Sequence, residues 1–390
     1  MIRVVHISTS DASIGVLLLN QLERFRAAGY EVVAVCNPGP YVPRIEAAGI
    51  RVAPVRMIRA VTPWADLGSL ARLVRTLRRE RPTIVHTHTP KAGLLGQYAA
   101  LLARVPVRVH TIHGLYLPGH MTPRTRPLYV GLERATMLPA HLSLSQNPED
   151  IPVAVRERIC RPERIAFLGN GIDLARFDPA RVPAARVQAL RAELGLAPGE
   201  RVVGIVGRVN REKGYPEFFQ AAARIAARVP GARFVVVGPV EQEKFDALDP
   251  VALAREAGVE DRTRYLGLRD DMPELYSLMD VLVLPSHREG FPRAPMEASA
   301  MGRPVVATDV RGCRQAVSDG VTGFLTPLRD PAALADAVVR LLEDPALAGR
   351  MGRAARAYAL ENFDERDAIR RTLDAYDRLL GRAPAPGVAA

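Results

Sequence analysis

Short apolar runs rich in β-branched residues alternate with stretches of helical periodicity along almost the whole chain. The runs before residue 170 are 2–7, 31–36, 51–55, 83–87, 107–112, 141–145 and 164–169. Between most of them, apolar residues recur at helical spacing, as in Leu18, Leu22 and Phe25. Strands that alternate with helices in this way predict a parallel, doubly wound α/β sheet.

A second series of the same kind follows a stretch rich in Pro and small residues at 172–200. Its expected strands are 201–207, 233–238, 263–267, 281–285, 304–308 and 322–327. We therefore expect two Rossmann-like domains in tandem, spanning 1–180 and 181–362, with substrate bound in the cleft between them. An amphipathic helix at 364–380 is expected to complete the N-terminal domain, and the tail 381–390 is expected to be disordered.

The composition excludes several classes of protein. In 390 residues, of which 48% are hydrophobic, the three cysteines stand at no paired spacing, so neither a disulfide framework nor a zinc cluster is expected. The chain opens on a predicted strand, without the layout of a secretory signal, and no apolar run approaches the ~20 residues that span a bilayer. We expect a cytoplasmic protein whose membrane association, if any, is peripheral.

The net charge of +11 is concentrated in the first half. Residues 1–180 hold 23 basic and 13 acidic side chains, whereas residues 181–390 hold 30 and 29. This asymmetry indicates an anionic partner for the first half only. Because the basic residues are 50 Arg and only 3 Lys, the arginine excess fits genome base composition and is not interpreted as nucleic-acid binding.

The richest motif is the segment 285–327, directly after the expected strand 281–285. Glu289 follows the strand end, Gly290, Phe291 and Pro292 form a turn, and Glu297 lies about one turn into a helix expected at 294–301. Free amides at a helix N-terminus can hold an anion or a sugar hydroxyl. A carboxylate such as that of Glu297 commonly holds ribose by accepting hydrogen bonds from vicinal hydroxyls.

A second motif occupies 204–221, again after an expected strand. Gly207 ends that strand, and Arg208 and Lys213 flank a loop that ends in Gly214. The two cations can converge on one diphosphate, the arginine with a fork and the lysine as a point charge. Taken alone, the pair could equally be a solvated basic loop.

Histidines mark the expected strand ends of the first half. His113 lies in HTIHGLY at 110–116, where a histidine satisfied within the core is the simpler interpretation. The pairs His86/His88 and His110/His113 could also be metal ligands, but no carboxylate or cysteine stands at ligand spacing, so no metal site is expected.

The run E-G-F-P-x4-E-A-x3-G-x-P-V-V-A-T-D at 289–309 resembles the nucleotide-sugar glycosyltransferases of family 4. The similarity extends over DGVTGFLTP at 319–327 and in all from Ile2 to about Leu380. The resemblance implies the two-domain GT-B fold and retaining transfer of a sugar from a nucleotide diphosphate donor, here a UDP-sugar, without a metal cofactor. It also implies a lipid-linked saccharide acceptor in cell-surface polysaccharide synthesis.

The same resemblance implies roles for individual residues. Arg208 and Lys213 would bind the donor's pyrophosphate beside Gly207, Glu289 would hold sugar hydroxyls, and Glu297 would hold the ribose. His113 would reach the reacting sugar, and backbone groups near Leu268 and Arg269 would frame the nucleobase. The implied catalytic set is His113, Glu289, Arg208 and Lys213; the implied donor-binding set adds Gly290, Phe291 and Pro292. Many relatives carry paired glycines after the first strand, where STSDASIG at 8–15 has only Gly15, so the role of Gly15 in this loop stays open.

Two other functions remain possible at this point: a nucleotide-sugar 2-epimerase of the same fold, and a non-catalytic protein that binds nucleotide sugars. For the basic half, the segments 66–82 and 115–131 mix apolar residues with arginines, including Arg124 and Arg126. Such segments suit an anionic leaflet at the inner face of the cell membrane. A packed helix with a solvated basic face is the alternative.

Overall fold

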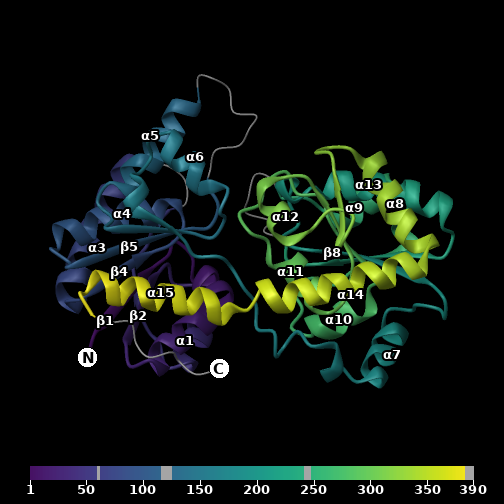
Figure 1. Cartoon of the computed structure of the whole chain (residues 1–390), viewed down its shortest axis with the longest axis horizontal. Coiled ribbons are helices and arrows are strands. Elements are labelled where there is room, and N and C mark those ends of the chain that lie inside the picture. Colours follow the sequence, from purple (N-terminus) through teal and green to yellow (C-terminus); the bar gives the residue numbers. More distant parts are fainter. Residues whose placement is uncertain (59–61, 116–124, 241–246, 383–390) are drawn as a thin grey trace. The chain divides into compact units, whose positions relative to one another are not determined.

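The structure is a computed structural model that describes residues 1–58, 62–115, 125–240 and 247–382. The chain divides into two compact units, one formed by Met1–Gly169 with Arg366 onward and the other by Asn170–Glu365 (Figure 1). The division between the units thus precedes the predicted boundary at 180–181, because the segment 170–200 packs with the second unit. Most of the predicted tail, 383–390, lies outside the described residues.

The N-terminal unit is built on a seven-stranded parallel sheet. Its order is β3-β2-β1-β4-β5-β6-β7, so the direction of winding reverses between β1 and β4. The strands are β1 (Arg3–Ile7), β2 (Glu31–Cys36), β3 (Arg51–Pro54), β4 (Ile84–Thr87), β5 (Val107–Ile112), β6 (Leu142–Ser145) and β7 (Ile165–Phe167). All seven predicted strands of this half are confirmed.

Helices cover both faces of this sheet. They are α1 (Leu19–Ala27), α2 (Val42–Ala47), α3 (Pro63–Glu80), α4 (Pro90–Leu102), α5 (Arg126–Met137), α6 (Asp150–Arg156) and α15 (Glu365–Leu379), with a π-helical turn η1 (Ser13–Leu18) and a 3-10 turn η2 (Pro162–Arg164). The predicted C-terminal helix therefore exists, and Ile369, Leu373 and Tyr376 of α15 join the core of the N-terminal unit.

The C-terminal unit repeats the plan with six parallel strands in the order β10-β9-β8-β11-β12-β13, and its winding reverses between β8 and β11. The strands are β8 (Arg201–Val206), β9 (Ala232–Val237), β10 (Thr263–Tyr265), β11 (Val281–Leu284), β12 (Val305–Thr308) and β13 (Gly323–Thr326). Each lies where the sequence predicts one, and the two sheets confirm the expected pair of Rossmann-like domains.

Its helices are α7 (Ala184–Glu193), α8 (Tyr215–Arg228), α9 (Pro250–Glu256), α10 (Met272–Leu278), α11 (Arg293–Ala300), α12 (Arg311–Ala316), α13 (Pro331–Glu343) and α14 (Pro345–Asn362), with 3-10 turns η3 (Pro179–Arg181), η4 (Arg211–Lys213) and η5 (Glu260–Arg262). Three of them begin at an Asp-Pro pair. Asp249, Asp330 and Asp344 each accept hydrogen bonds from backbone amides of the first turn, and the following proline is preorganised for the helix.

Central strands such as β1, β8 and β11 are largely apolar because each sheet is covered on both faces, whereas the edge strand β10 is mostly exposed. In β1, Val4 and Val5 belong to two different core clusters, one on each side of the sheet. In β8, Val202 and Val203 do the same in the second unit. Buried strand positions such as these explain why the strand pattern in the sequence is continuous instead of alternating.

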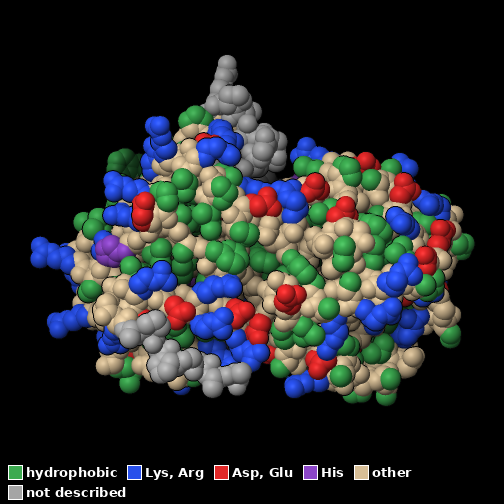
Figure 2. Space-filling model, in the orientation of Figure 1, with side chains coloured by type: hydrophobic (Ala, Val, Ile, Leu, Met, Phe, Trp, Pro, Cys, Tyr) green, Lys and Arg blue, Asp and Glu red, His purple; other side chains and the backbone are tan. Residues whose placement is uncertain are grey.

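Charged and apolar side chains are interspersed on the surface drawn in Figure 2. Several large apolar side chains of the N-terminal unit are strongly exposed, among them Trp64 at 87%, Leu128 at 64% and Leu138 at 65%. None of the helices in the described ranges is long and apolar enough to cross a membrane.

Candidate active site

The motif residues of the C-terminal unit gather where the winding of its sheet reverses. Gly207 and Arg208 directly follow β8, and the segment that leads to Glu289 directly follows β11, the neighbouring strand. In open α/β sheets, ligands bind outside the carboxyl ends of the strands at this reversal. The fold therefore brings the two main sequence motifs to one edge.

Gly214 allows the two loops to approach each other. Its φ is +74°, and a Cβ at this position would lie 2.0 Å from the carbonyl oxygen of Pro285, so no side chain fits. The approach places Lys213 Nζ 2.5 Å from Glu289 Oε1, with the side chains 20% and 8% exposed. Lys213 and Glu289 thus form an almost buried ion pair, which the sequence did not show.

Further bonds fix the same two loops. The His287 backbone amide donates to the carbonyl oxygen of Glu212 at 2.8 Å, and Arg288 Nε donates to the Glu212 carboxylate at 2.9 Å. His287 Nε2 lies 2.8 Å from Glu217 Oε1. Burial acts to raise the pKa of Glu217, but hydrogen bonds from His287 and from the Glu217 backbone amide, together with nearby positive charge, hold that pKa below its usual value. These contacts hold in place the two loops that carry Lys213 and Glu289.

Glu297 has partners already. It lies in α11, whose N-cap is Pro292, and its Oε2 accepts a hydrogen bond from the Tyr276 hydroxyl at 2.8 Å. Arg293 Nε is 3.7 Å from its Oε1. Burial, together with the charge of Glu297, raises the pKa of Tyr276 well above its usual value, so this tyrosine is a neutral donor. The Glu297 carboxylate, predicted to be open to ribose, thus already has Tyr276 and Arg293 as partners.

The remaining predicted donor residues lie on nearby loops of the same unit. Phe291 contacts the core and its carbonyl oxygen accepts a hydrogen bond from Asn170 Nδ2 at 2.9 Å. Leu268 is 63% exposed beyond the end of β10. Arg269 pairs with Asp271 at 2.6 Å and with Glu193 at 3.1 Å.

His113 follows β5 in the N-terminal unit, and both of its ring nitrogens are engaged. Nε2 lies 3.1 Å from His88 Nδ1, and Nδ1 lies 3.1 Å from Gln146 Oε1. Burial lowers the pKa of His113 to about 4, which keeps the ring neutral at physiological pH. The structure thus joins His113 to other side chains of its own unit.

Three buried histidines, His6, His86 and His88, lie close enough together to invite comparison with a metal site. The rings of His86 and His88 stack with centroids 4.5 Å apart, whereas the His6 ring is tilted by 34° to that of His86. Imidazole lone pairs lie in the ring plane, and His6 Nδ1 faces His88 Nε2 at 3.0 Å, so these two nitrogens are directed at each other and not at a common point. His86 also contacts the Tyr376 hydroxyl and Thr111 Oγ1, both at 2.6 Å. The donor set fits a hydrogen-bonded cluster better than a zinc site.

Of the loop expected at 8–15, only residues 8–10 form a loop. The chain is helical from Asp11, and Gly15 lies buried inside η1. A Cβ on Gly15 would lie 2.9 Å from Tyr41 Cβ, so packing against α2 explains the glycine. At the reversal of this sheet, Thr89 has φ +64° and its hydroxyl lies 2.9 Å from that of Thr9. Such a β-branched outlier commonly marks a functional site.

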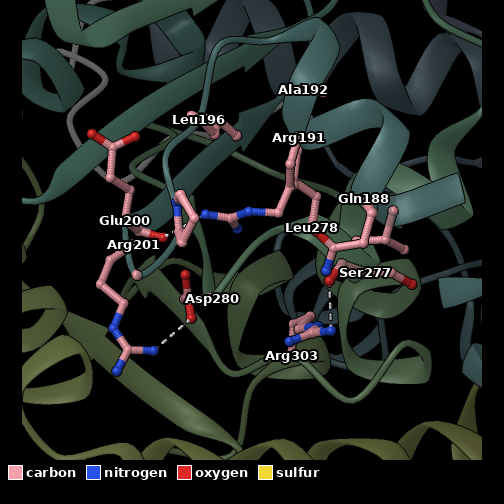
Figure 3. A pocket seen from close by; sticks show the side chains of 13 residues that line it. Gln188, Arg191, Ala192, Leu196, Glu200, Arg201, Ser277, Leu278, Asp280 and Arg303 are labelled. Atoms are coloured by element: carbon pink, nitrogen blue, oxygen red, sulfur yellow. Dashed lines mark hydrogen bonds and ion pairs between the residues drawn. The ribbon is translucent and has the colours of Figure 1, made fainter. Parts of the chain in front are cut away.

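A cavity of about 550 Å³ lies at the amino ends of the strands of the second sheet, opposite the carboxyl ends that carry the candidate active site (Figure 3). Arg201 begins β8, and Asp280 directly precedes β11; their side chains pair at 3.2 Å. Arg303 donates to the Ser277 carbonyl oxygen at 2.7 Å. The lining holds none of the predicted site residues, so this cavity is separate from the candidate active site.

The sequence model described as glycosyl transferases group 1 matches residues 187–358, and that of the glycosyl transferase 4-like domain matches residues 14–171. A D-inositol 3-phosphate glycosyltransferase of Salinispora arenicola is 33% identical over 307 residues, covering 75% of this chain and 68% of that protein. The chain belongs to the group 1 glycosyltransferases.

Another relative of this group 1 glycosyltransferase is the UDP-Gal:alpha-D-GlcNAc-diphosphoundecaprenol alpha-1,3-galactosyltransferase of Escherichia coli. It is 29% identical over 354 residues, which cover 89% of each chain. Among solved structures, Anabaena Alr3699/HepE in complex with UDP-glucose superposes with a TM-score of 0.83 at 23% identity, covering 97% of this chain and 100% of that one. The expected GT-B fold and the enzyme class are confirmed.

In this glycosyltransferase, sequence reasoning missed the partners of the predicted residues. Tyr276 and Gly312 carry no motif signal of their own, and His6 reads as one more residue of an apolar strand. Its polarity within a buried run was the available signal. Gln146 directly follows β6, just as other predicted site residues lie just after the strands that they follow, and this position was its signal.

Proposed function

We propose that this glycosyltransferase moves a sugar from a UDP-sugar to a hydroxyl of a lipid-linked saccharide, with retention of configuration and without a metal ion. The observation that carries the proposal is the Lys213–Glu289 pair at the reversal of the donor unit's sheet. It sets a cation and a carboxylate side by side at the edge where ligands of such sheets bind.

The chemistry requires stabilisation of the charge that develops on the departing diphosphate. The Lys213 ammonium has three N–H donors, of which Glu289 occupies one, so it can donate to phosphate oxygens as well. Arg208, across the same loop, adds a fork of donors. Preorganised cations in a shielded site supply this stabilisation without a metal. Glu289 would then accept hydrogen bonds from sugar hydroxyls, and Glu297 from the ribose.

The acceptor proposal rests on the relatives and on the N-terminal unit. The Escherichia coli relative is named for a diphosphoundecaprenol-linked acceptor. The N-terminal unit carries most of the basic excess and exposes apolar side chains that include Trp64. Both observations support an enzyme of cell-surface polysaccharide synthesis that docks at the inner face of the cell membrane.

The test compares Lys213→Ala and Glu289→Gln with the unaltered enzyme. Lys213→Ala should lower kcat/KM by about 10²-fold or more, since removal of one electrostatic donor commonly costs that much. Glu289→Gln should lower it as well, because it removes the carboxylate that pairs with Lys213 and accepts from the sugar hydroxyls. Arg201→Ala is the matched control, because it breaks the ion pair with Asp280 in the same unit, at the amino ends of the strands and away from the candidate site. Transfer from a panel of UDP-sugars to undecaprenyl-linked acceptors is followed by mass spectrometry, with folding checked by circular dichroism.

Four outcomes would contradict the proposal in different ways. Full activity of either site variant would remove Lys213 and Glu289 from the site, and loss of turnover in EDTA would show that a metal is needed. Conversion of the donor sugar without acceptor would indicate an epimerase, whereas donor binding without turnover on any acceptor would indicate a non-catalytic protein.

A further inference from the structure

A line of hydrogen-bonded side chains crosses the carboxyl edge of the first sheet, with one residue from each of four neighbouring strands. His6 lies in β1, and His88, His113 and Gln146 directly follow β4, β5 and β6. His6 Nδ1 is 3.0 Å from His88 Nε2, and His88 Nδ1 is 3.1 Å from His113 Nε2. His113 Nδ1 then meets Gln146 Oε1 at 3.1 Å. We call His6, His88 and His113 the histidine relay.

The direction of the relay follows from the amide oxygen at its end. Gln146 Oε1 can only accept, so His113 carries its proton on Nδ1 and its Nε2 is an acceptor. His88 must then donate from Nδ1 and accept at Nε2, and His6 must donate from Nδ1. Every ring of the relay is therefore the same Nδ1–H tautomer.

The relay is isolated from its surroundings. His6 and His88 are 0% and 1% exposed, and His6 Nε2 has no hydrogen-bond partner among the described residues. His86 stacks on His88 but bonds to Tyr376 and Thr111, so it lies beside the relay without belonging to it. The relay thus ends in the core at His6 and at the ligand edge at Gln146.

We propose that His6 and His88 are positioning residues that hold His113 as a neutral imidazole with its single N–H at Nδ1. A neutral imidazole has one N–H, which His113 gives to Gln146, so a ligand oxygen can receive a hydrogen bond from this ring only at Nδ1, by sharing or displacing Gln146. The relay thereby fixes the ring and the donor atom before substrate arrives. Its effect on transfer rests on the proposed function, whereas the tautomer is a property of the free protein.

The tautomer is measured on the unaltered, substrate-free chain labelled with ¹⁵N-histidine. Two-bond ¹H–¹⁵N spectra should show Nδ1 protonated and Nε2 unprotonated for His6, His88 and His113. An Nε2–H tautomer at His113 would overturn the proposal. This measurement needs neither a known substrate nor a stable variant, so it can fail independently of the transferase assignment.

Activity then separates positioning from packing. His88→Leu should lower kcat at least tenfold with little change in the KM for donor. His88→Asn should stay within about threefold of the unaltered enzyme, because its amide nitrogen lies near the place of Nδ1 and can still donate to His113. His86→Leu is the matched control, equally buried but outside the relay. Equal losses in His86→Leu and His88→Leu, or no rescue by Asn, would show a purely structural role.

Discussion

At the scale of single residues, two glycines determine whether the ion pair Lys213–Glu289 can form. Gly214 lets the loop after β8 approach Pro285. Gly312, in the first turn of α12, faces Glu289 so closely that a Cβ there would lie 2.6 Å from the Glu289 carbonyl carbon and from its Cβ. Because the contact is with backbone, Glu289 itself would have to move.

We predict that Gly312→Ala lowers transfer activity at least tenfold while the fold persists. The added methyl would displace Glu289 from Lys213, and misplacement by about 1 Å can cost 10²-fold in rate. Gly231→Ala serves as the control, because nothing lies within 4 Å of a Cβ at that position. Kinetics and thermal unfolding of the two variants are compared; equal activity in both would show that Glu289 tolerates the displacement.

The residues of the candidate site could be predicted where they belong to a motif with many fixed positions. The side chains that contact them could not. The resemblance to the family motifs marks Glu289, Glu297, Arg208 and Lys213, since a motif fixes its members relative to one strand end. The contact of Glu297 with Tyr276 joins different helices, and the histidine relay joins four strands. Such contacts depend on how strands are ordered across a sheet, which local periodicity does not contain.

At the scale of elements, the outer face of α5 combines apolar and basic side chains. Leu128 and Leu132 lie one turn apart and are 64% and 37% exposed, and Leu138 beyond the helix end is 65% exposed. A neighbouring cavity of about 590 Å³ has walls that include Met137 and Ile159. Four arginines and no acidic residue line it: Arg134, Arg158, Arg161 and Arg164. Of the predicted membrane segment 115–131, Arg126 is described and pairs with Glu157, whereas Arg124 lies outside the described residues.

We predict that the protein binds anionic vesicles at low salt through this face. Leu128→Ser and Leu138→Ser should weaken binding, and added salt should weaken it further, since each basic residue near the surface contributes about 1 kcal/mol. Leu360→Ser, at a leucine of the C-terminal unit that is 50% exposed, is the control. Flotation with phosphatidylglycerol and phosphatidylcholine vesicles measures the effect. Equal binding to neutral vesicles, or an equal effect of Leu360→Ser, would argue for a solvated basic face.

Elements were the most predictable level of this structure. Every predicted strand exists. The central strands are buried on both faces and leave unbroken apolar runs, whereas the edge strands β3 and β10 are more exposed. The segment 8–15 was misjudged because its Ser, Thr and Asp residues favour turns, whereas the buried Ile14, Leu18 and Leu19 draw the chain into a helix against the sheet.

At the scale of the whole molecule, the buried histidines make the two units differ in their response to acid. Burial lowers the pKa of His6 and His110 to about 3 and that of His113 to about 4, and it holds those of His86 and His88 well below the usual value. Unfolded histidine titrates near 6.5. Below that pH the unfolded N-terminal unit binds protons that the folded unit does not, so its free energy of unfolding falls.

We therefore predict that the N-terminal unit loses stability first as the pH falls from about 6.5 toward 4, by roughly 1.4 kcal/mol per pH unit for each such histidine. The C-terminal unit has a single histidine, His287. Hydrogen exchange resolved by peptide, at a series of pH values, distinguishes the units. Earlier loss of protection in the C-terminal unit would contradict the prediction.

The N-terminal unit is discontinuous in sequence, and this affects how the chain is made. Its core includes Ile369, Leu373 and Tyr376 of α15, at the far end of the chain, whereas the C-terminal unit is a single stretch that ends at Glu365. Domains usually fold as units during synthesis, the N-terminal one first. Here the unit translated first lacks part of its core until α15 has been translated, so we expect the C-terminal unit, a continuous stretch, to complete its core first.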